Sequence, residues 1–229
     1  MSTTNKKAYI YKMNLVPANI LSIIIFILLL VLTMLLNINI LISNQNILIA
    51  FILMILYLGL HELLHGVGFF IGGTKRKNIK YGICLEKGIF YCMACEEITK
   101  KNILISLQIP FVVIGIITYI IGAIFNIPIL VLLSIVNITG ASMDIAMFFY
   151  ILSLPKDVTY SETSKPDEFV LISKTDLTTK KNPFIKVVEV KDYHKRDYIF
   201  KNTKKIEITK ISIIILIMFI LLGLITALL

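Results

Sequence analysis

NILIAFILMILYLGLHELLHGVGFFIG, residues 46–72, is an almost uninterrupted apolar run whose only charged side chain, Glu62, lies between His61 and His65. A bilayer hydrocarbon core about 30 Å thick needs roughly 20 apolar residues in helical conformation to span it. The run therefore predicts a transmembrane helix that carries the motif HELLH within the membrane. A Gly-Gly pair directly after it, followed by a basic stretch, favours the end of this helix.

The composition predicts that most of the chain is a membrane protein. The 229 residues are 57% hydrophobic with a mean hydropathy of +0.87, which excludes an ordinary soluble domain of this length. The run after the basic N-terminus is too long for a cleaved signal peptide, so we interpret it as an uncleaved first span. Four further transmembrane helices are predicted, at about residues 17–36, 103–125, 128–152 and 209–229.

The connections between these spans complete the predicted fold class. Asn126-Ile127 is so short that the third and fourth spans should form an antiparallel helical hairpin, and Pro110 should kink the third. Residues 79–98 contain β-branched and aromatic stretches around Glu86-Lys87-Gly88, which predicts a β-hairpin. We therefore expect a polytopic α-helical membrane protein with about five transmembrane helices, a β-hairpin after the second, and a small cytosolic α/β or β-rich segment.

This pattern divides the chain into a membrane core over residues 1–152, a small cytosolic domain over 153–208 and a C-terminal helix over 209–229. The basic segments are the N-terminus, the connection 73–102 and the polar region, whereas the remaining two connections carry no charge. Lysine and arginine favour the cytosolic side, so the N-terminus and both polar segments are expected in the cytosol, and the resemblance given below implies that the membrane is a bacterial plasma membrane. The net charge of +9 then reflects topology and contact with membrane lipid, and not nucleic-acid binding.

HELLH has the pattern of a catalytic zinc motif. Two histidines four residues apart lie on one face of a helix, one turn apart, which is the spacing that lets both bind one Zn²⁺. Glu62 is placed to act as the general base that takes a proton from the attacking water and returns it to the leaving amine. The chain has three histidines, and two fall in this motif. A carboxylate in mid-membrane also costs at least about 2.5 kcal/mol unless it has a partner or a function.

Asp144 is the acidic residue of the other membrane spans and the predicted third ligand, because a catalytic zinc keeps one position open for water. At about 1.5 Å per residue, His65 lies about 12 Å and Asp144 about 15 Å from the cytosolic ends of two parallel helices. The two side chains are thus expected at one depth. Asn137 is seven residues before Asp144, on the same helical face, where its amide could bind substrate or the oxyanion, or form an inter-helix polar contact.

Other residues that could bind metal are weaker candidates. Cys92 and Cys95 have a CxxC spacing, but Cys84 is the remaining cysteine and no second CxxC exists, so we expect neither a disulfide framework nor a second metal site. His194 lies among lysine and arginine residues and is interpreted as a solvated surface histidine.

These residues resemble those of the site-2-protease-like intramembrane metalloproteases, which combine HExxH in one membrane helix with an aspartate in a later one. More specifically, HELLHGVGFF (61–70), QIPF (108–111) and NITGASMDI (137–145) resemble a bacterial membrane family of zincin peptidases. The resemblance implies His61, His65 and Asp144 as zinc ligands, Glu62 as catalytic base and Asn137 as a substrate-facing amide. The proline-rich pattern usual around that asparagine in site-2 proteases is absent here.

We therefore predict a zinc-dependent intramembrane endopeptidase whose substrate is a membrane protein or peptide. The alternative is a non-proteolytic metal-binding membrane protein, either a transporter, a sensor or an immunity-type scaffold that uses the same three ligands. Glu62 separates the two hypotheses, because only hydrolysis needs a general base beside the metal. The sequence makes no prediction about oligomeric state.

Overall fold

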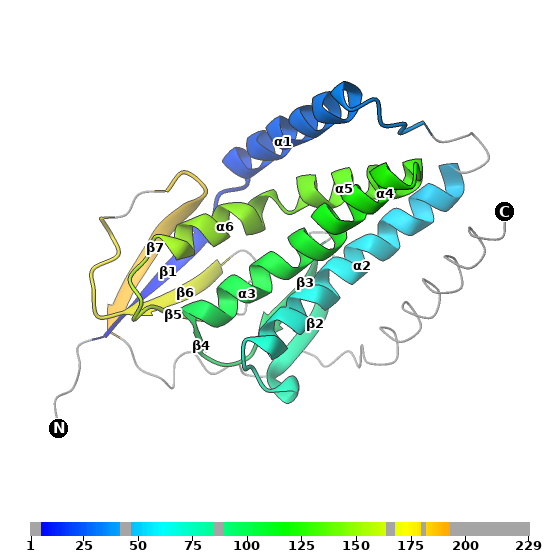
Figure 1. Ribbon diagram of the computed structural model, residues 1–229. Helices are drawn as coiled ribbons and strands as arrows, with labels where there is room; N and C mark the ends of the chain where they lie inside the picture. The colour runs from blue at the N-terminus through cyan, green and yellow to red at the C-terminus, as the bar shows by residue number, and fades with distance from the viewer. Residues whose placement is uncertain (1–5, 42–46, 85–88, 164–167, 180–181, 193–229) are drawn as a thin grey trace.

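The computed structural model describes residues 6–41, 47–84, 89–163, 168–179 and 182–192. The predicted C-terminal span over 209–229 and His194 lie outside these residues. Figure 1 shows long helices that run beside one another, with the strands of the larger sheet gathered at one of their ends. The site is positioned by the helices and by two sheets that pack against them.

The first two predicted spans are helices α1 (Leu15–Leu35) and α2 (Ile47–Ile71). Their outward side chains are apolar and exposed, as contact with lipid requires; Leu28, for example, is 62% exposed. Gly73, with a φ of 106°, ends α2, and the Thr74 N–H then bonds the Phe69 carbonyl at 2.9 Å. This is the glycine-terminated helix end that the sequence predicts.

The third predicted span is a continuous helical segment with an irregular middle. It consists of α3 (Lys100–Pro110), a π-helical turn (Phe111–Ile117) and α4 (Thr118–Ile124). Pro110 has no N–H to donate to the preceding turn, so the hydrogen-bond pattern changes directly after it. The π-helical turn begins directly after Pro110, the residue where the sequence predicts a kink.

The fourth predicted span is not one straight helix, and the prediction of a continuous helix over 128–152 is wrong in this respect. It consists of α5 (Pro128–Gly140) and α6 (Ser142–Leu152), which bend by 50° at Ala141. The Thr139 carbonyl, at the end of α5, accepts a hydrogen bond from Ser22 Oγ of α1 at 3.0 Å. A side chain from a neighbouring helix thus satisfies backbone at the break, which the local sequence does not reveal.

Three helices in the described part of the chain are long and apolar enough to cross a membrane, namely α1, α2 and the segment Lys100–Ile124. The bent pair α5 and α6 makes a fourth if it counts as one span. The chain is therefore a membrane-associated protein with several helical spans and a small β region.

The larger sheet has the strand order β4-β5-β6-β1-β7, and all of its neighbours are antiparallel. Its strands are β1 (Lys7–Met13), β4 (Ile98–Thr99), β5 (Thr159–Glu162), β6 (Glu168–Ser173) and β7 (Ile185–Asp192). The central strand β1 comes from the N-terminus, whereas β5, β6 and β7 come from the predicted cytosolic domain. The N-terminal segment and the polar region after α6 therefore lie on the same side of the helices, as the predicted topology requires.

The predicted hairpin is present as a separate two-stranded sheet of β2 (Ile79–Cys84) and β3 (Ile89–Ala94). It packs against α2. The predicted range extended to residue 98, but Ile98 belongs to β4 of the larger sheet. The hairpin is the β element nearest to the HELLH motif in the sequence, directly after α2.

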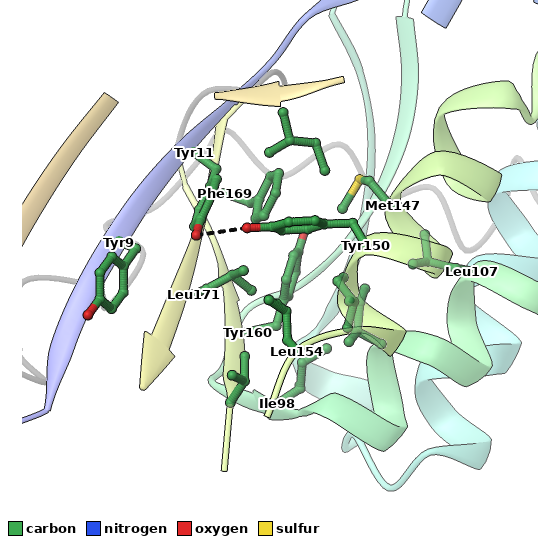
Figure 2. Close-up of a cluster of buried hydrophobic side chains, with 14 of the residues drawn as sticks. Tyr9, Tyr11, Ile98, Leu107, Met147, Tyr150, Leu154, Tyr160, Phe169 and Leu171 are labelled. Atoms are coloured by element: carbon green, nitrogen blue, oxygen red, sulfur yellow. Dashed lines mark hydrogen bonds between the residues drawn. The ribbon is translucent and has the colours of Figure 1, made fainter. Parts of the chain in front are cut away.

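The main core lies between the larger sheet and the ends of α3 and α6. Figure 2 shows Tyr11, Phe169 and Tyr160 side by side on the face of the sheet that meets the helices. The Tyr150 hydroxyl of α6 donates a hydrogen bond to the Tyr11 hydroxyl at 3.0 Å. Leu154 and Met147 fill the space beside them. The sheet is therefore fixed rigidly against the helices that carry the candidate site.

Candidate metal centre

Three side chains from two helices converge at the predicted metal site. His61 and His65 are on α2, and Asp144 is in the first turn of α6. His61 Nε2 lies 3.1 Å from Asp144 Oδ2 and 3.1 Å from His65 Nε2, and His65 Nε2 lies 3.5 Å from Asp144 Oδ2. Within the described residues this trio forms a cluster that could hold a metal ion.

The spacing of the three donor atoms fits zinc. Nitrogen and oxygen ligands of tetrahedral Zn²⁺ are about 2.0–2.1 Å from the metal, so they are about 3.3 Å from one another. The three measured separations, 3.1, 3.1 and 3.5 Å, are close to this value. Two imidazoles and one carboxylate also match the donor set of catalytic zinc sites, which leave a fourth position for water. The residues present therefore fit the metal.

The other ring nitrogen of each histidine has a partner that orients the ring. His65 Nδ1 lies 2.9 Å from the Ser106 carbonyl oxygen, which can only accept, so Nδ1 carries the hydrogen. His61 Nδ1 lies 2.9 Å from Asn137 Oδ1 and donates to it in the same way. In the neutral rings both Nε2 atoms then present lone pairs toward Asp144, the arrangement that a shared metal ion needs.

A close helix pair holds His65 in place. Ser106 Oγ of α3 donates to the His65 carbonyl at 2.9 Å, while the Ser106 carbonyl accepts from the His65 ring. This reciprocal pair is possible because Gly68, one turn after His65, lets the backbones approach; a Cβ there would lie 2.4 Å from Ser106 Cα. Gly72 lies equally close to Asn102, so α2 has a small residue at each turn of this contact.

Glu62 is beside the trio and faces the hairpin. Its side chain is partly buried, and the backbone N–H of Cys92 in β3 interacts favourably with its carboxylate. The hairpin is fixed on α2 by Tyr81, whose hydroxyl packs against Gly66 so closely that a Cβ there would lie 1.8 Å away. Strand β3 therefore orients the predicted base from the extramembrane side.

The predicted site residues thus come together in the structure. Asn137 is on α5 and Asp144 on α6, yet both meet His61 despite the bend between the two helices. The Asn137 Oδ1 atom is engaged with His61, while its buried Nδ2 has no hydrogen-bond partner among the described residues. Its role as a substrate-facing amide stays a prediction. Sequence reasoning missed Ser106, because its contribution is largely a backbone carbonyl.

Cys92 in β3 and Cys95 directly after β3 are free thiols. Neither Cys92 nor Cys95 forms a disulfide. Burial raises the pKa of the Cys92 thiol well above its ordinary value, and nearby carboxylates raise it further. A protonated thiol is neither a strong nucleophile nor a metal ligand. The Cys84 side chain lies outside the described residues.

Comparison with known proteins agrees with this geometry. Residues 54–159 match the sequence model of a family described as "Putative zincin peptidase". The matched segment contains the HELLH motif, the hairpin, Ser106, Asn137 and Asp144. No curated protein and no solved structure matches the chain. The segment that builds the candidate metal centre therefore matches this zincin peptidase family, which confirms that part of the predicted resemblance. The resemblance to site-2 proteases stays a prediction.

Proposed function

We propose that the protein is a zinc-dependent intramembrane endopeptidase that hydrolyses a peptide bond of a membrane protein or peptide. The observation that carries the proposal is the convergence of three possible ligand atoms, from His61, His65 and Asp144, next to the carboxylate of Glu62. The family match supports a metallopeptidase. The location of the histidines within α2, an apolar helix long enough to cross a membrane, supports cleavage within or beside the bilayer.

Each residue of the site has a role in this proposal. Zinc held there would acidify water and polarise the substrate carbonyl. Glu62 accepts the proton of the attacking water and delivers it to the leaving nitrogen. Asn137 and the Ser106 carbonyl fix the two imidazole rings so that Nε2 faces the metal. A substrate helix has its peptide groups already hydrogen-bonded, so it must be extended locally before Glu62 and the metal can act on it.

The proposed orientation puts the N-terminus and both sheets in the cytosol of a bacterial cell, with the helices in the plasma membrane. The described lysines and arginines are all in β strands, in extramembrane connections or in the first turn of α3, and none is inside α1, α2, α5 or α6. This distribution follows the preference of basic residues for the cytosolic side. Anionic lipid head groups are therefore proposed as partners of the extramembrane face.

Metal content tests the proposed function directly. Purified full-length protein is expected to bind one zinc ion per chain, measured by elemental analysis after removal of free metal. Asp144→Ala removes one of the three ligands. Loss of a residue that only hydrogen-bonds a ligand lowers metal affinity roughly 10- to 100-fold, so the zinc affinity of this variant should fall by more than that. Asp176→Asn, a change to an exposed carboxylate on a turn after β6, should bind zinc normally. Wild-type protein without stoichiometric zinc would contradict the proposal.

Asn137 is expected to act on zinc affinity through His61. Asn137→Leu keeps the side-chain volume but removes the acceptor of the His61 Nδ1 hydrogen, so the ring loses its fixed tautomer and zinc affinity should fall about 10- to 100-fold. Asn137→Asp keeps an acceptor oxygen and should retain most of the affinity. Competition with a zinc-chelating dye measures both variants. Equal affinities of wild type and Asn137→Leu would show that the hydrogen bond does not support the metal.

A further inference from the structure

Strand β5 returns beside α6 and brings a third carboxylate, after Asp144 and Glu62, toward the metal site. After α6 ends at Leu152, the chain turns and runs back through Thr159–Glu162. Side chains two residues apart in a strand lie on the same face of a sheet. Tyr160 lies on the face that meets the helices, beside Tyr150 and Leu154 (Figure 2). Glu162 is therefore on this face too, farther along the strand in the direction of the site.

Glu162 is on a strand that packs against β3 and α3, the elements that contact Glu62 and His65. Its carboxyl interacts electrostatically with Glu62 and His65, and with the Cys92 thiol of β3, which packs against β5. The Tyr160 hydroxyl interacts favourably with the Glu162 carboxyl. Within the described part of the chain no lysine or arginine forms an ion pair with it. Figure 1 shows β5 at the end of the helices where α3 begins and α6 ends.

The environment makes a lone carboxylate costly at this position. Burial raises the pKa of Glu162 to about 7, and the negative charge of Glu62 adds to this, while Tyr160 and His65 partly oppose it. The side chain nevertheless keeps part of its surface accessible. A partly accessible, desolvated carboxyl that has no ion-pair partner among the described residues is stabilised by a cationic group that arrives from outside.

The proposed substrate supplies such a group. In the proposed orientation, the cytosolic end of a substrate's membrane segment lies on the side of the sheets. This end carries lysine or arginine, because these residues are enriched on cytosolic flanks. The chain itself has a net charge of +9, so most of its extramembrane surface repels such a flank. Glu62 and Glu162 are two carboxylates that interact with each other and can attract it, and Glu62 is committed to the chemistry.

We propose that Glu162 is a specificity-determining residue, which binds a lysine or arginine side chain of the substrate close to the bond that is cleaved. The proposal rests on the proposed function and adds the substrate class, a segment with a basic residue beside the scissile bond on its cytosolic flank. Tyr160 orients the carboxylate, and the aromatic row across β5, β6 and β1 holds the strand at a fixed distance from α6.

A binding experiment tests this without depending on turnover. The protein is the zinc-loaded full-length Glu62→Gln variant in detergent micelles. The probes are fluorescent peptides of alanine and leucine that carry one lysine, or one norleucine, at each position in turn. Lysine and norleucine share an apolar stem, so their difference reports the ammonium group. At one position or two neighbouring ones, lysine is expected to bind about tenfold or more tightly than norleucine.

Variants assign this preference to Glu162. Glu162→Gln in the same background should reduce the ratio of lysine to norleucine affinity to about one, and Glu162→Lys should invert it. Glu189→Gln, which changes an exposed carboxylate on β7, should leave the ratio unchanged. Zinc content must stay stoichiometric in each variant, which shows that the fold and the metal site are intact.

Three results would overturn the inference. The first is that lysine is preferred at no position, and the second is that the preference survives Glu162→Gln. The third is measured in protein that retains Glu62: Glu162→Gln lowers the hydrolysis rate of the lysine and norleucine peptides equally. The last result would assign Glu162 to proton transfer. Failure of the proposed function would give a different result. The wild-type protein would then bind no zinc, or would bind zinc and cleave no peptide, whatever the lysine preference.

Discussion

Replacing Glu62 by glutamine is expected to lower the rate of peptide hydrolysis by about 10²- to 10⁴-fold while zinc stays bound. The amide has nearly the shape of the carboxylate but cannot accept the proton of the attacking water. His61, His65 and Asp144 are untouched, so metal content should equal that of the wild type. The measurement compares accumulation of uncleaved membrane substrates in the native membrane with zinc content of the purified protein.

Glu189→Gln is a matched control, because it removes a carboxylate of the same kind from the exposed face of β7. It should leave both hydrolysis and zinc content unchanged. If Glu62→Gln bound zinc and lost no function, the protein would be a metal-binding transporter, sensor or scaffold, since these have no need for a general base beside the metal. The endopeptidase proposal would then be wrong, although the metal site would remain.

Adding one methyl group at Gly68 is expected to damage both the fold and the metal site. In Gly68→Ala the new Cβ would lie 2.4 Å from Ser106 Cα, 3.0 Å from Ser106 N and 3.2 Å from the Ile105 carbonyl oxygen. These are backbone atoms of a packed helix and cannot move aside singly, so α2 and α3 must separate. Overpacking of this kind costs about 1–3 kcal/mol. Separation of the two helices also lengthens the hydrogen bond between His65 Nδ1 and the Ser106 carbonyl oxygen.

Gly140→Ala is the matched control for this prediction. Gly140 is also in a membrane helix, at the end of α5, but a Cβ there has no atom within 4 Å among its neighbours. Thermal unfolding in detergent and zinc affinity should both fall for Gly68→Ala and stay near the wild-type values for Gly140→Ala. Equal stability of the two variants would show that the close contact between α2 and α3 is not what holds His65.

Prediction from sequence was most accurate where length and hydrophobicity decide the outcome. The first two helices, the hairpin after α2 and the helix-ending glycine at 73 follow from local patterns. The bend at Ala141 was missed because Ser22, whose hydroxyl donates a hydrogen bond to the Thr139 carbonyl beside the bend, is on a helix far away in the sequence. Strand β1 was missed because its neighbours in the sheet, β6 and β7, are more than 150 residues away. The predicted C-terminal span lies outside the described residues.

The sequence by itself determined which side chains make the candidate metal centre. HELLH fixes two imidazoles and a carboxylate on one helical turn, and depth reasoning singled out Asp144 as the side chain that could join them. Only the tertiary structure decided how these groups are held. The Ser106 carbonyl, the Asn137 amide, the Cys92 N–H and the Glu162 carboxyl reach the site from separate elements. Their contacts depend on helix packing and strand pairing. These bring together residues that are far apart in the sequence, so no local sequence pattern relates them.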